Sequence, residues 1–589
     1  MLALAATAPV HAVTWLKLQT EDVVIYSDAS SKDVVEFAIG YSAYRHVFKQ
    51  LLAPRQKPAP ATVLLFRRLG TLHDYVPRST DDDSTTVSYN ADVDGDELTA
   101  ISVDGDRHTA LRQMYEFDTV WELRRSGYAL PIWMSQGAGE VLASLEVEKT
   151  KCVIGDGPDS YDETWSRGSN LAWTRFFDVS TDSPEYVGPQ ANGVFHAQAW
   201  ALMHRVLLAD DGGTARFVQL ADKLRTEGGL DAVRSVLGVK ERDLTTDIFR
   251  HRGRTREYPF DTAGLRSRLH PQPAPEAEVR VELANLLVAA NKGAEAEQEL
   301  ARARTLAPDS PAVKEALARQ AFRDSEPEYG IKLYRDAIAA GSTSPHAYLV
   351  SAKQRLDDNM TGGRDHQGDG SPGVEQAIDE LHRALQLDPG STEAYNLLGR
   401  AFFVRTTLNP GDVKELEPGI VSGTAGAAVR YYRALVYRRM GQHDAYAADL
   451  RAILADRSVS NQLRNSVREQ LVSDEVNATA KEMDRLARLG KFDEARALIA
   501  KQEADPQNVD ETDQYERMRA WLSENQDWNA VREAYDAKDW REVRTLVGKF
   551  MDKYPRSRLL PAARQVLNQA EQFAGDAAPA PKPDDASSP

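Results

Sequence analysis

The chain has 589 residues, more than a single hydrophobic core accommodates, so its length predicts several domains. Its net charge of -17 argues against nucleic acid and anionic membrane as main partners, because both attract concentrated positive charge. The single cysteine, Cys152, cannot form an intramolecular disulfide and cannot alone hold a structural zinc ion.

The first twelve residues, MLALAATAPVHA, form a short apolar run that ends in Val10, His11 and Ala12. Small residues at the third-last and last positions are typical of a signal-peptidase site, so we expect residues 1–12 to be a signal-peptide remnant. The protein is then expected to be periplasmic or secreted in a bacterium; a frayed cytosolic N-terminus is the alternative. No later segment approaches twenty apolar residues, so we expect no transmembrane segment.

Residues 13–256 mix strand-like and helix-like segments and predict an α+β domain with a small sheet. Residues 22–28 (DVVIYSD) and 61–68 (ATVLLFRR) are rich in Val, Ile and Leu and are bounded by turn-forming residues, which is typical of strands. The segment ELTAISVDG is a further strand candidate and precedes the helical pattern RHTALRQMYEFDTVWELRRSG. Pro131 opens a second helix in LPIWMSQGAGEVLASLEV, and the remainder is expected to be helical.

Residues 257–276 include most of the proline-rich stretch HPQPAPEAE and predict a linker. Residues 277–572 then repeat. A set of small, large and small residues recurs after steps of 34 and 47 residues, as Ala296, Leu300 and Ala303, then Gly330, Tyr334 and Ala337, then Ala377, Leu381 and Ala384. A 34-residue helix–turn–helix period is the signature of tetratricopeptide repeats, so we expect an all-α solenoid; a non-repeating helical bundle is the alternative.

The packing positions of these repeats are expected to be buried, with small residues where helices approach and large residues filling the gaps between them. They are Leu283, Leu287, Ala296, Leu300, Ala303, Tyr334, Ala377, Tyr395, Leu398, Gly399, Phe402, Ala495 and Trp540. The concave surface of a solenoid suits a protein or peptide partner. The final residues, 573–589, are dominated by Pro, Ala and Asp and predict a disordered tail.

Residues 112–144, RQMYEFDTVWELRRSGYALPIWMSQGAGEVLAS, have the layout of a zinc-peptidase helix pair. With the later helix FHAQAWALMHRVLL, this segment makes residues 13–256 resemble the gluzincin-type (peptidase MA-like) domain found ahead of tetratricopeptide repeats in bacterial exported proteins. In such domains H-E-x-x-H supplies two zinc ligands and a general base, and the next helix supplies a glutamate as third ligand. The resemblance places Tyr115 and Thr119 at the histidine positions, Glu116 at the base position and Gln136 at the third-ligand position.

These replacements are poor zinc ligands. A phenol, a hydroxyl and an amide are neutral oxygen donors, whereas zinc prefers imidazole, thiolate and carboxylate. Without a metal, Glu116 would have to activate water whose pKa is far above the value of about 7 for zinc-bound water. We therefore expect no catalytic residue, no metal and no cofactor in this domain, and a non-catalytic interaction protein overall.

Two alternatives stay open. An active metal-dependent hydrolase would need a non-standard site, for example one built from Glu116, Glu140 and a histidine such as His108. A purely structural envelope protein would assemble through its repeats, with the first domain as a cap.

Two further sets of polar residues are interpreted as structural. His196 and His204 lie eight residues apart on one helical face and are interpreted as packed or surface histidines. Glu122, close to Arg124 and Arg125, is interpreted as part of a solvated charge cluster.

Overall fold

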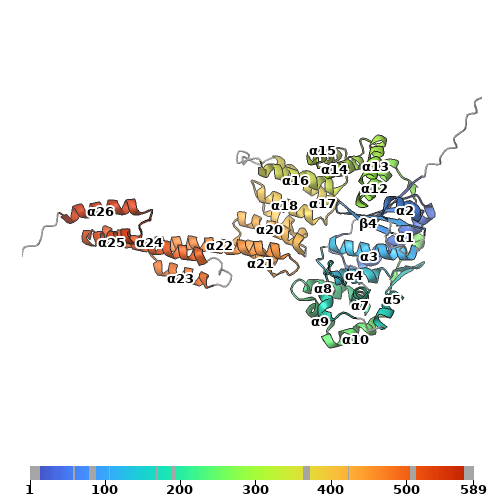
Figure 1. The fold of residues 1–589 in the computed structure, drawn as a ribbon, viewed down its shortest axis with the longest axis horizontal. Coiled ribbons are helices and arrows are strands. Elements are labelled where there is room, and N and C mark those ends of the chain that lie inside the picture. Colours follow the sequence, from blue (N-terminus) through green and yellow to red (C-terminus); the bar gives the residue numbers. More distant parts are fainter. Residues whose placement is uncertain are drawn as a thin grey trace, which may run out of the picture. The chain divides into compact units, whose positions relative to one another are not determined.

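The structure is a computed structural model that describes residues 14–57, 60–77, 88–104, 107–125, 127–166, 170–186, 193–361, 372–421, 423–504 and 512–575. The chain forms two compact units, Met1–Leu463 and Arg464–Pro589, and each is described by itself (Figure 1). The expected signal-peptide remnant lies outside the described residues, as does the expected tail from residue 576 onward.

The first unit opens with a six-stranded mixed sheet in the order β4-β5-β3-β2-β1-β9. Its strands are β1 (Leu16–Gln19), β2 (Val23–Ser27), β3 (Ala61–Phe66), β4 (Ser88–Val93), β5 (Asp96–Ser102) and β9 (Gln272–Pro273). The β2–β3 and β3–β5 pairs are parallel, and the other pairs are antiparallel. The predicted strands 22–28 and 61–68 are thus confirmed as β2 and β3, joined by the crossover helix α1 (Ser31–Leu52).

The sheet has a hydrophobic core on each face, because neighbouring residues of a strand point to opposite sides. Ile25 and Val63 are paired in register and pack with α1, α3 (Arg107–Arg125) and α4 (Ile132–Leu142). Tyr26 and Leu64, the following pair in the register, point to the opposite face of the sheet. There they pack with α2 (Leu69–Tyr75) and α12 (Glu276–Ala289). The first helix of the predicted repeats, α12, therefore also covers one face of the sheet.

Helices follow α4 on the first face of the sheet. They are α5 (Asp159–Ser166), α6 (Trp173–Phe177), α7 (Val194–Leu208), α8 (Gly213–Lys223), α9 (Gly229–Leu237) and α10 (Glu241–His251). A second, antiparallel sheet contains β6 (Glu146–Val147), β7 (Lys151–Ile154) and β8 (Arg256–Pro259). This arrangement of a small sheet followed by helices is the α+β architecture that the sequence predicts for the first region, defined from here on as residues 14–275.

The segment 257–276 differs from the predicted linker. It contributes most of β8, the short helix α11 (Thr262–Arg266) and β9. β9 pairs antiparallel with β1, and Pro273 lies opposite Leu16. Proline lacks a backbone N–H, so it is tolerated on an edge strand such as β9, and a proline-rich sequence is therefore compatible with a sheet edge.

Helical hairpins form the remainder of the first unit. They comprise α12, α13 (Gly293–Leu306), α14 (Pro311–Arg323), α15 (Pro327–Ala339), α16 (Pro345–Thr361), α17 (Pro372–Leu387), α18 (Thr392–Val404), α19 (Pro410–Glu415), a 3₁₀ helix (Glu417–Gly419), α20 (Gly423–Arg439) and α21 (His443–Ala455). α13 and α15 begin 34 residues apart, which is the period read from the sequence. The helical repeat region is thus confirmed as an arrangement of paired helices.

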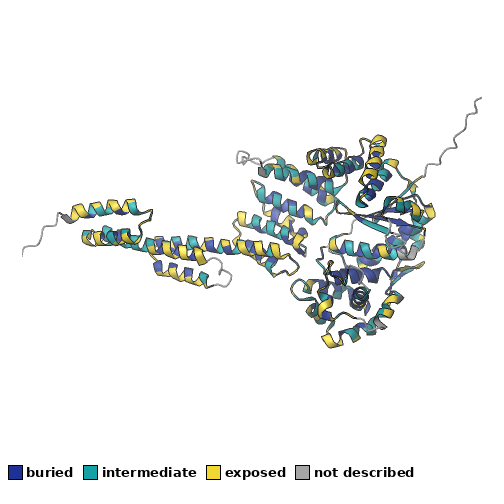
Figure 2. Ribbon diagram, in the orientation of Figure 1, coloured by how far each residue is buried: buried dark blue, intermediate teal, exposed yellow. Residues whose placement is uncertain are grey.

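Among the described residues of the second unit, four helices follow α22 (Asn461–Arg488), most of which lies in that unit. They are α23 (Phe492–Glu503), α24 (Thr512–Asp536), α25 (Trp540–Lys553) and α26 (Leu560–Gly575). Of the predicted packing residues in the two units, all are buried except Trp540, which is half-buried. Helices of the repeats in each unit have both buried and exposed residues (Figure 2). Among the described residues, no helix combines the length and the apolar character needed to cross a membrane.

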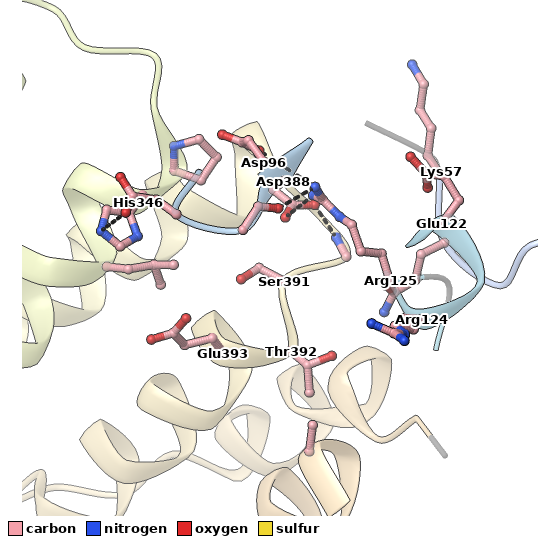
Figure 3. A pocket seen from close by; sticks show the side chains of 17 residues that line it. Lys57, Asp96, Glu122, Arg124, Arg125, His346, Asp388, Ser391, Thr392 and Glu393 are labelled. Atoms are coloured by element: carbon pink, nitrogen blue, oxygen red, sulfur yellow. Dashed lines mark hydrogen bonds and ion pairs between the residues drawn. The ribbon is translucent and has the colours of Figure 1, made fainter. Parts of the chain in front are cut away.

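A polar cleft of about 310 Å³ lies between the first region and the hairpins of the same unit (Figure 3). Arg125, at the end of α3, reaches across it and contacts Asp388 at 3.2 Å and Asp96 at 3.6 Å. Because Arg125 already has two carboxylate partners, we interpret this cleft as a joint between the first region and the repeats.

Candidate functional site

The segment with the zinc-peptidase layout folds into α3 and α4, and α7 packs against α4. Every residue of α4 is buried. Two glycines of the SQGAGE motif permit this packing. A Cβ atom at Gly137 would overlap the backbone carbonyl of Ala199 in α7, and one at Gly139 would lie 2.8 Å from the backbone oxygen of Glu116 in α3.

The residues at the two histidine positions face α1. The Tyr115 ring stacks on the Tyr44 ring, with centroids 4.8 Å apart and planes 5° apart. The Thr119 hydroxyl lies 3.0 Å from the Tyr44 hydroxyl and donates to the backbone oxygen of Tyr115 at 2.7 Å. Both side chains are buried, so aromatic packing fills the side of α3 where the resemblance implies two imidazoles.

Gln136 faces a different neighbour. Its side-chain amide donates to the Glu116 carboxylate, and its carbonyl accepts from the Tyr186 hydroxyl at 3.3 Å. Zinc requires its donors to converge at about 2.0–2.3 Å from one point. Tyr115 and Thr119 are held by α1, whereas Gln136 bonds to Glu116, so this set does not fit the zinc ion of the gluzincin-type domain in either chemistry or direction.

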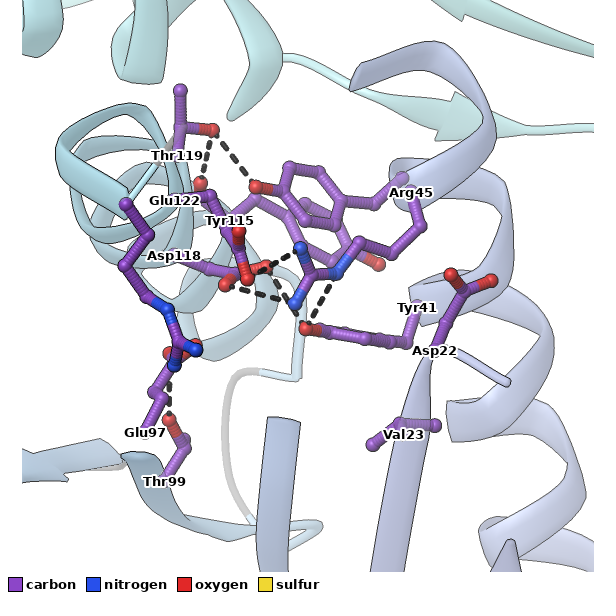
Figure 4. Close-up of polar contacts among 12 residues, drawn as sticks. Asp22, Val23, Tyr41, Arg45, Glu97, Thr99, Tyr115, Asp118, Thr119 and Glu122 are labelled. Carbon is purple, nitrogen blue, oxygen red and sulfur yellow. Dashed lines mark hydrogen bonds and ion pairs between the residues drawn. The ribbon is translucent and has the colours of Figure 1, made fainter. Parts of the chain in front are cut away.

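A buried charge network lies beside Tyr115 and Thr119 (Figure 4). The Arg45 guanidinium of α1 contacts Glu122 at 2.9 Å and Asp118 at 3.4 Å, and all three side chains are buried. The Tyr41 hydroxyl donates to Asp118 and accepts from Arg45, both at 2.9 Å. The prediction of a solvated Glu122 is therefore wrong, because the i,i+4 spacing turns Asp118 and Glu122 together toward α1.

A third carboxyl group, that of Glu97 in β5, belongs to the same network. Burial raises the pKa of Glu97 well above its ordinary value, and the charge of Asp118 and a hydrogen bond to it raise the pKa further. The network thus brings three carboxyl groups, those of Glu97, Asp118 and Glu122, close to one guanidinium.

Glu116 points away from this network and meets Glu140 of α4 and His196 of α7. One potential ligand atom from each of these three residues lies within 4.8 Å of the other two. The Nδ1 atom of His196 lies 2.9 Å from a carboxylate oxygen of Glu140, which is 5% exposed. The Tyr186 ring stacks on the His196 ring, with centroids 5.7 Å apart. We call Glu116, Glu140 and His196 the three-helix cluster.

The electrostatics of the three-helix cluster follow from burial and mutual repulsion. Burial raises the pKa of Glu116 to about 7, and the Glu140 charge contributes to this shift. Burial alone would lower the pKa of His196, but the hydrogen bond to Glu140 and the two carboxylate charges outweigh it and leave the pKa raised. Near neutral pH, Glu116 is therefore able to exchange a proton.

The two histidines of α7, which the sequence analysis interprets alike, differ in the structure. His204 is buried, its Nε2 lies 3.1 Å from the backbone oxygen of Gly155, and burial lowers its pKa to about 4, so it is a packed histidine. His196 instead joins Glu116 and Glu140, and the interpretation of it as only packed or exposed missed this. The side chain of His108, the histidine weighed with these two glutamates, lies outside the described residues.

Comparisons with known proteins add little. No protein-family model and no curated protein matches the chain. Matching solved structures include a monomeric mutant of IFIT1 with Gppp-AAAA and a further variant of that mutant with m7Gppp-AAAA. For each of these two structures the sequence identity is 12% and the TM-score is 0.25. The match covers 66% of this chain and 71% of the matched chain. A TM-score this low carries no argument, so the class of protein rests on the architecture itself: an α+β region followed by helical-hairpin repeats.

Proposed function

We propose that the protein is a non-catalytic, exported interaction protein. Its repeats, of the tetratricopeptide type, would bind a protein or peptide partner, and its first region would be a peptidase-like domain without the zinc chemistry of that class. The observation that carries the non-catalytic part is the Tyr44–Tyr115 stack. It supports the view that the former ligand side of α3 now stabilises the contact with α1.

The partner-binding part is supported by the paired helices of both units, because helical-hairpin repeats present extended surfaces to partners. The exported part rests on the apolar N-terminal run and its small residues at positions 10 and 12. N-terminal sequencing of the protein recovered from cell fractions tests that part directly.

A peptide-cleavage assay tests the non-catalytic part. The full chain is incubated with a mixture of unfolded protein substrates, with added zinc or with a chelator, and the products are identified by mass spectrometry. We expect no chelator-sensitive cleavage. We also expect the double variant Tyr115→His with Thr119→His to gain none, because both positions face α1 and not Glu116.

The main alternative is a metal-dependent hydrolase that uses Glu116, Glu140 and a histidine. The convergence of the first two with His196 favours it over other enzyme classes. Chelator-sensitive cleavage that is lost in Glu116→Gln would establish this alternative and overturn the proposal. A structural envelope protein, the other alternative, would assemble through its repeats, and its assembly should survive deletion of residues 13–256.

A further inference from the structure

Glu116, Glu140 and His196 come from three helices, α3, α4 and α7, and we propose that together they bind one divalent transition-metal ion, with zinc as the best fit. Two carboxylates and one imidazole are ligand types that zinc accepts. The site differs from the one that the gluzincin resemblance implies, because it uses Glu116, the base position, in place of Tyr115 and Thr119. Successive residues of a helix are about 100° apart, so this is another side of α3.

The distances are compatible with one ion. Ligands bound at about 2.0–2.2 Å from zinc lie roughly 3 to 4 Å from one another. The 2.9 Å between His196 Nδ1 and the Glu140 oxygen already lies close to that range. All three ligand atoms lie within 4.8 Å of one another, so shifts of about 1 Å in side-chain position suffice to close the set around an ion.

The charge of the cluster also favours a cation. Two carboxyl groups converge on one imidazole, so the cluster carries a net negative charge once both carboxyl groups are deprotonated. Glu140 is almost fully buried, whereas Glu116 and His196 keep partial exposure. An ion could therefore enter from the exposed side and would be held against a buried carboxylate.

Neighbouring side chains hold two of the three ligands in place. Gln136 donates a hydrogen bond to Glu116, and the Tyr186 ring stacks on His196. Outer partners of this kind fix the orientation of metal ligands and tune their affinity. Because Gly137 and Gly139 let the three helices approach closely, the backbone as well as the side chains supports the arrangement.

Zinc binding to the full chain tests this inference. The purified protein is treated with a chelator, dialysed, and titrated with zinc chloride at pH 7.5 by isothermal titration calorimetry. We expect one zinc ion per chain. The single variants Glu116→Gln, Glu140→Gln and His196→Asn should each weaken that binding by about 100-fold or more, since loss of an outer partner alone costs 10- to 100-fold.

Two matched controls separate this site from incidental binding. His46→Asn and Glu146→Gln remove a histidine and an exposed glutamate elsewhere in the first region and should leave the affinity unchanged. X-ray absorption at the zinc edge of the wild-type protein should show one imidazole and otherwise oxygen ligands, a readout that does not depend on the folding of any variant. Magnesium, which prefers oxygen ligands alone, should compete poorly.

Absence of stoichiometric zinc binding, or binding that all three variants retain, would overturn the inference. The inference concerns binding and stands apart from the proposed function. Zinc binding without cleavage supports both. Zinc binding with chelator-sensitive cleavage supports the site and overturns the non-catalytic proposal, whereas a protein that neither binds zinc nor cleaves overturns only the site.

Discussion

Replacing Arg45 by methionine is expected to destabilise the first unit strongly. The guanidinium is fully buried and contacts the carboxyl groups of Asp118 and Glu122. Methionine fills much of the same volume with apolar atoms, so a cavity contributes little. The two carboxyl groups would lose this guanidinium while remaining buried. Removing one partner of a buried ion pair typically costs about 3–5 kcal/mol.

Protonation limits this cost and gives it a pH dependence. Keeping a carboxyl group protonated at pH 7 costs about 4 kcal/mol when its pKa is that of an ordinary glutamate. The reason is that each pH unit above the pKa costs about 1.4 kcal/mol. Burial already raises the pKa of Glu122, and Arg45 opposes that shift, so removing Arg45 raises it further. A carboxyl whose folded-state pKa is raised destabilises the protein once the pH exceeds its unfolded value. The cost of the substitution should therefore be about 2 kcal/mol smaller at pH 5.5 than at pH 7.

Hydrogen–deuterium exchange of peptides from α3, followed by mass spectrometry in increasing urea, measures the opening free energy of this region without assuming that the whole chain unfolds in one step. Lys49→Met on the same helix is the matched control. Lys49 contacts Asp22 at 2.7 Å but is partly exposed, so its loss should cost about 1 kcal/mol or less. If the two variants lose similar stability at pH 7, or if the cost for Arg45 does not shrink at pH 5.5, the reasoning about the buried network is refuted.

Three further substitutions, one of them a control, test other parts of the structure. Glu97→Gln should flatten the pH dependence of the free energy of unfolding. Because folding raises the pKa of Glu97, this residue stabilises the wild-type protein fully at pH values below the ordinary glutamate pKa. That stabilisation is lost as the pH rises through the folded-state pKa. Urea midpoints between pH 4.5 and 8 measure this, and equal slopes in the two proteins would contradict it. Gly137→Ala should lower the free energy of unfolding by about 1–3 kcal/mol, because the added Cβ would collide with α7. Gly548→Ala, at a helical position of the second unit with open space around it, should raise the free energy of unfolding by about 0.5–1 kcal/mol. Thermal melts of both variants check the contrast, and similar shifts in both would argue against the close approach of α4 and α7.

Local patterns in the sequence predicted the elements but not their partners. The strands β2 and β3 follow from runs of Val, Ile and Leu, and the helical hairpins follow from a 34-residue period. The burial of Glu122 does not follow from its neighbours Arg124 and Arg125. It depends on Arg45 in α1, far upstream in the sequence, and no local pattern reports that contact.

The same limit applies to the three-helix cluster. Glu116 and Glu140 stood out because they lie within a recognisable motif, but His196 is 56 residues beyond Glu140. What brings it close is the packing of α7 on α4, which depends on Gly137 opposite Ala199. A glycine in a helical pattern is a signal of close packing, yet it does not name the helix that approaches.

The position of α12 has a consequence for the order in which this protein can fold. Val279, Leu283 and Leu286 of α12 cover one face of the sheet, and β9 completes its edge beside β1. About 220 residues separate the end of β3 from the end of α12. At synthesis rates of 5–20 residues per second, that interval lasts roughly 11 to 44 s. During this interval α2 covers Leu64 and Phe66 without α12, and β1 has an open edge, so the incomplete first region exposes apolar surface and an unpaired strand until α12 is made.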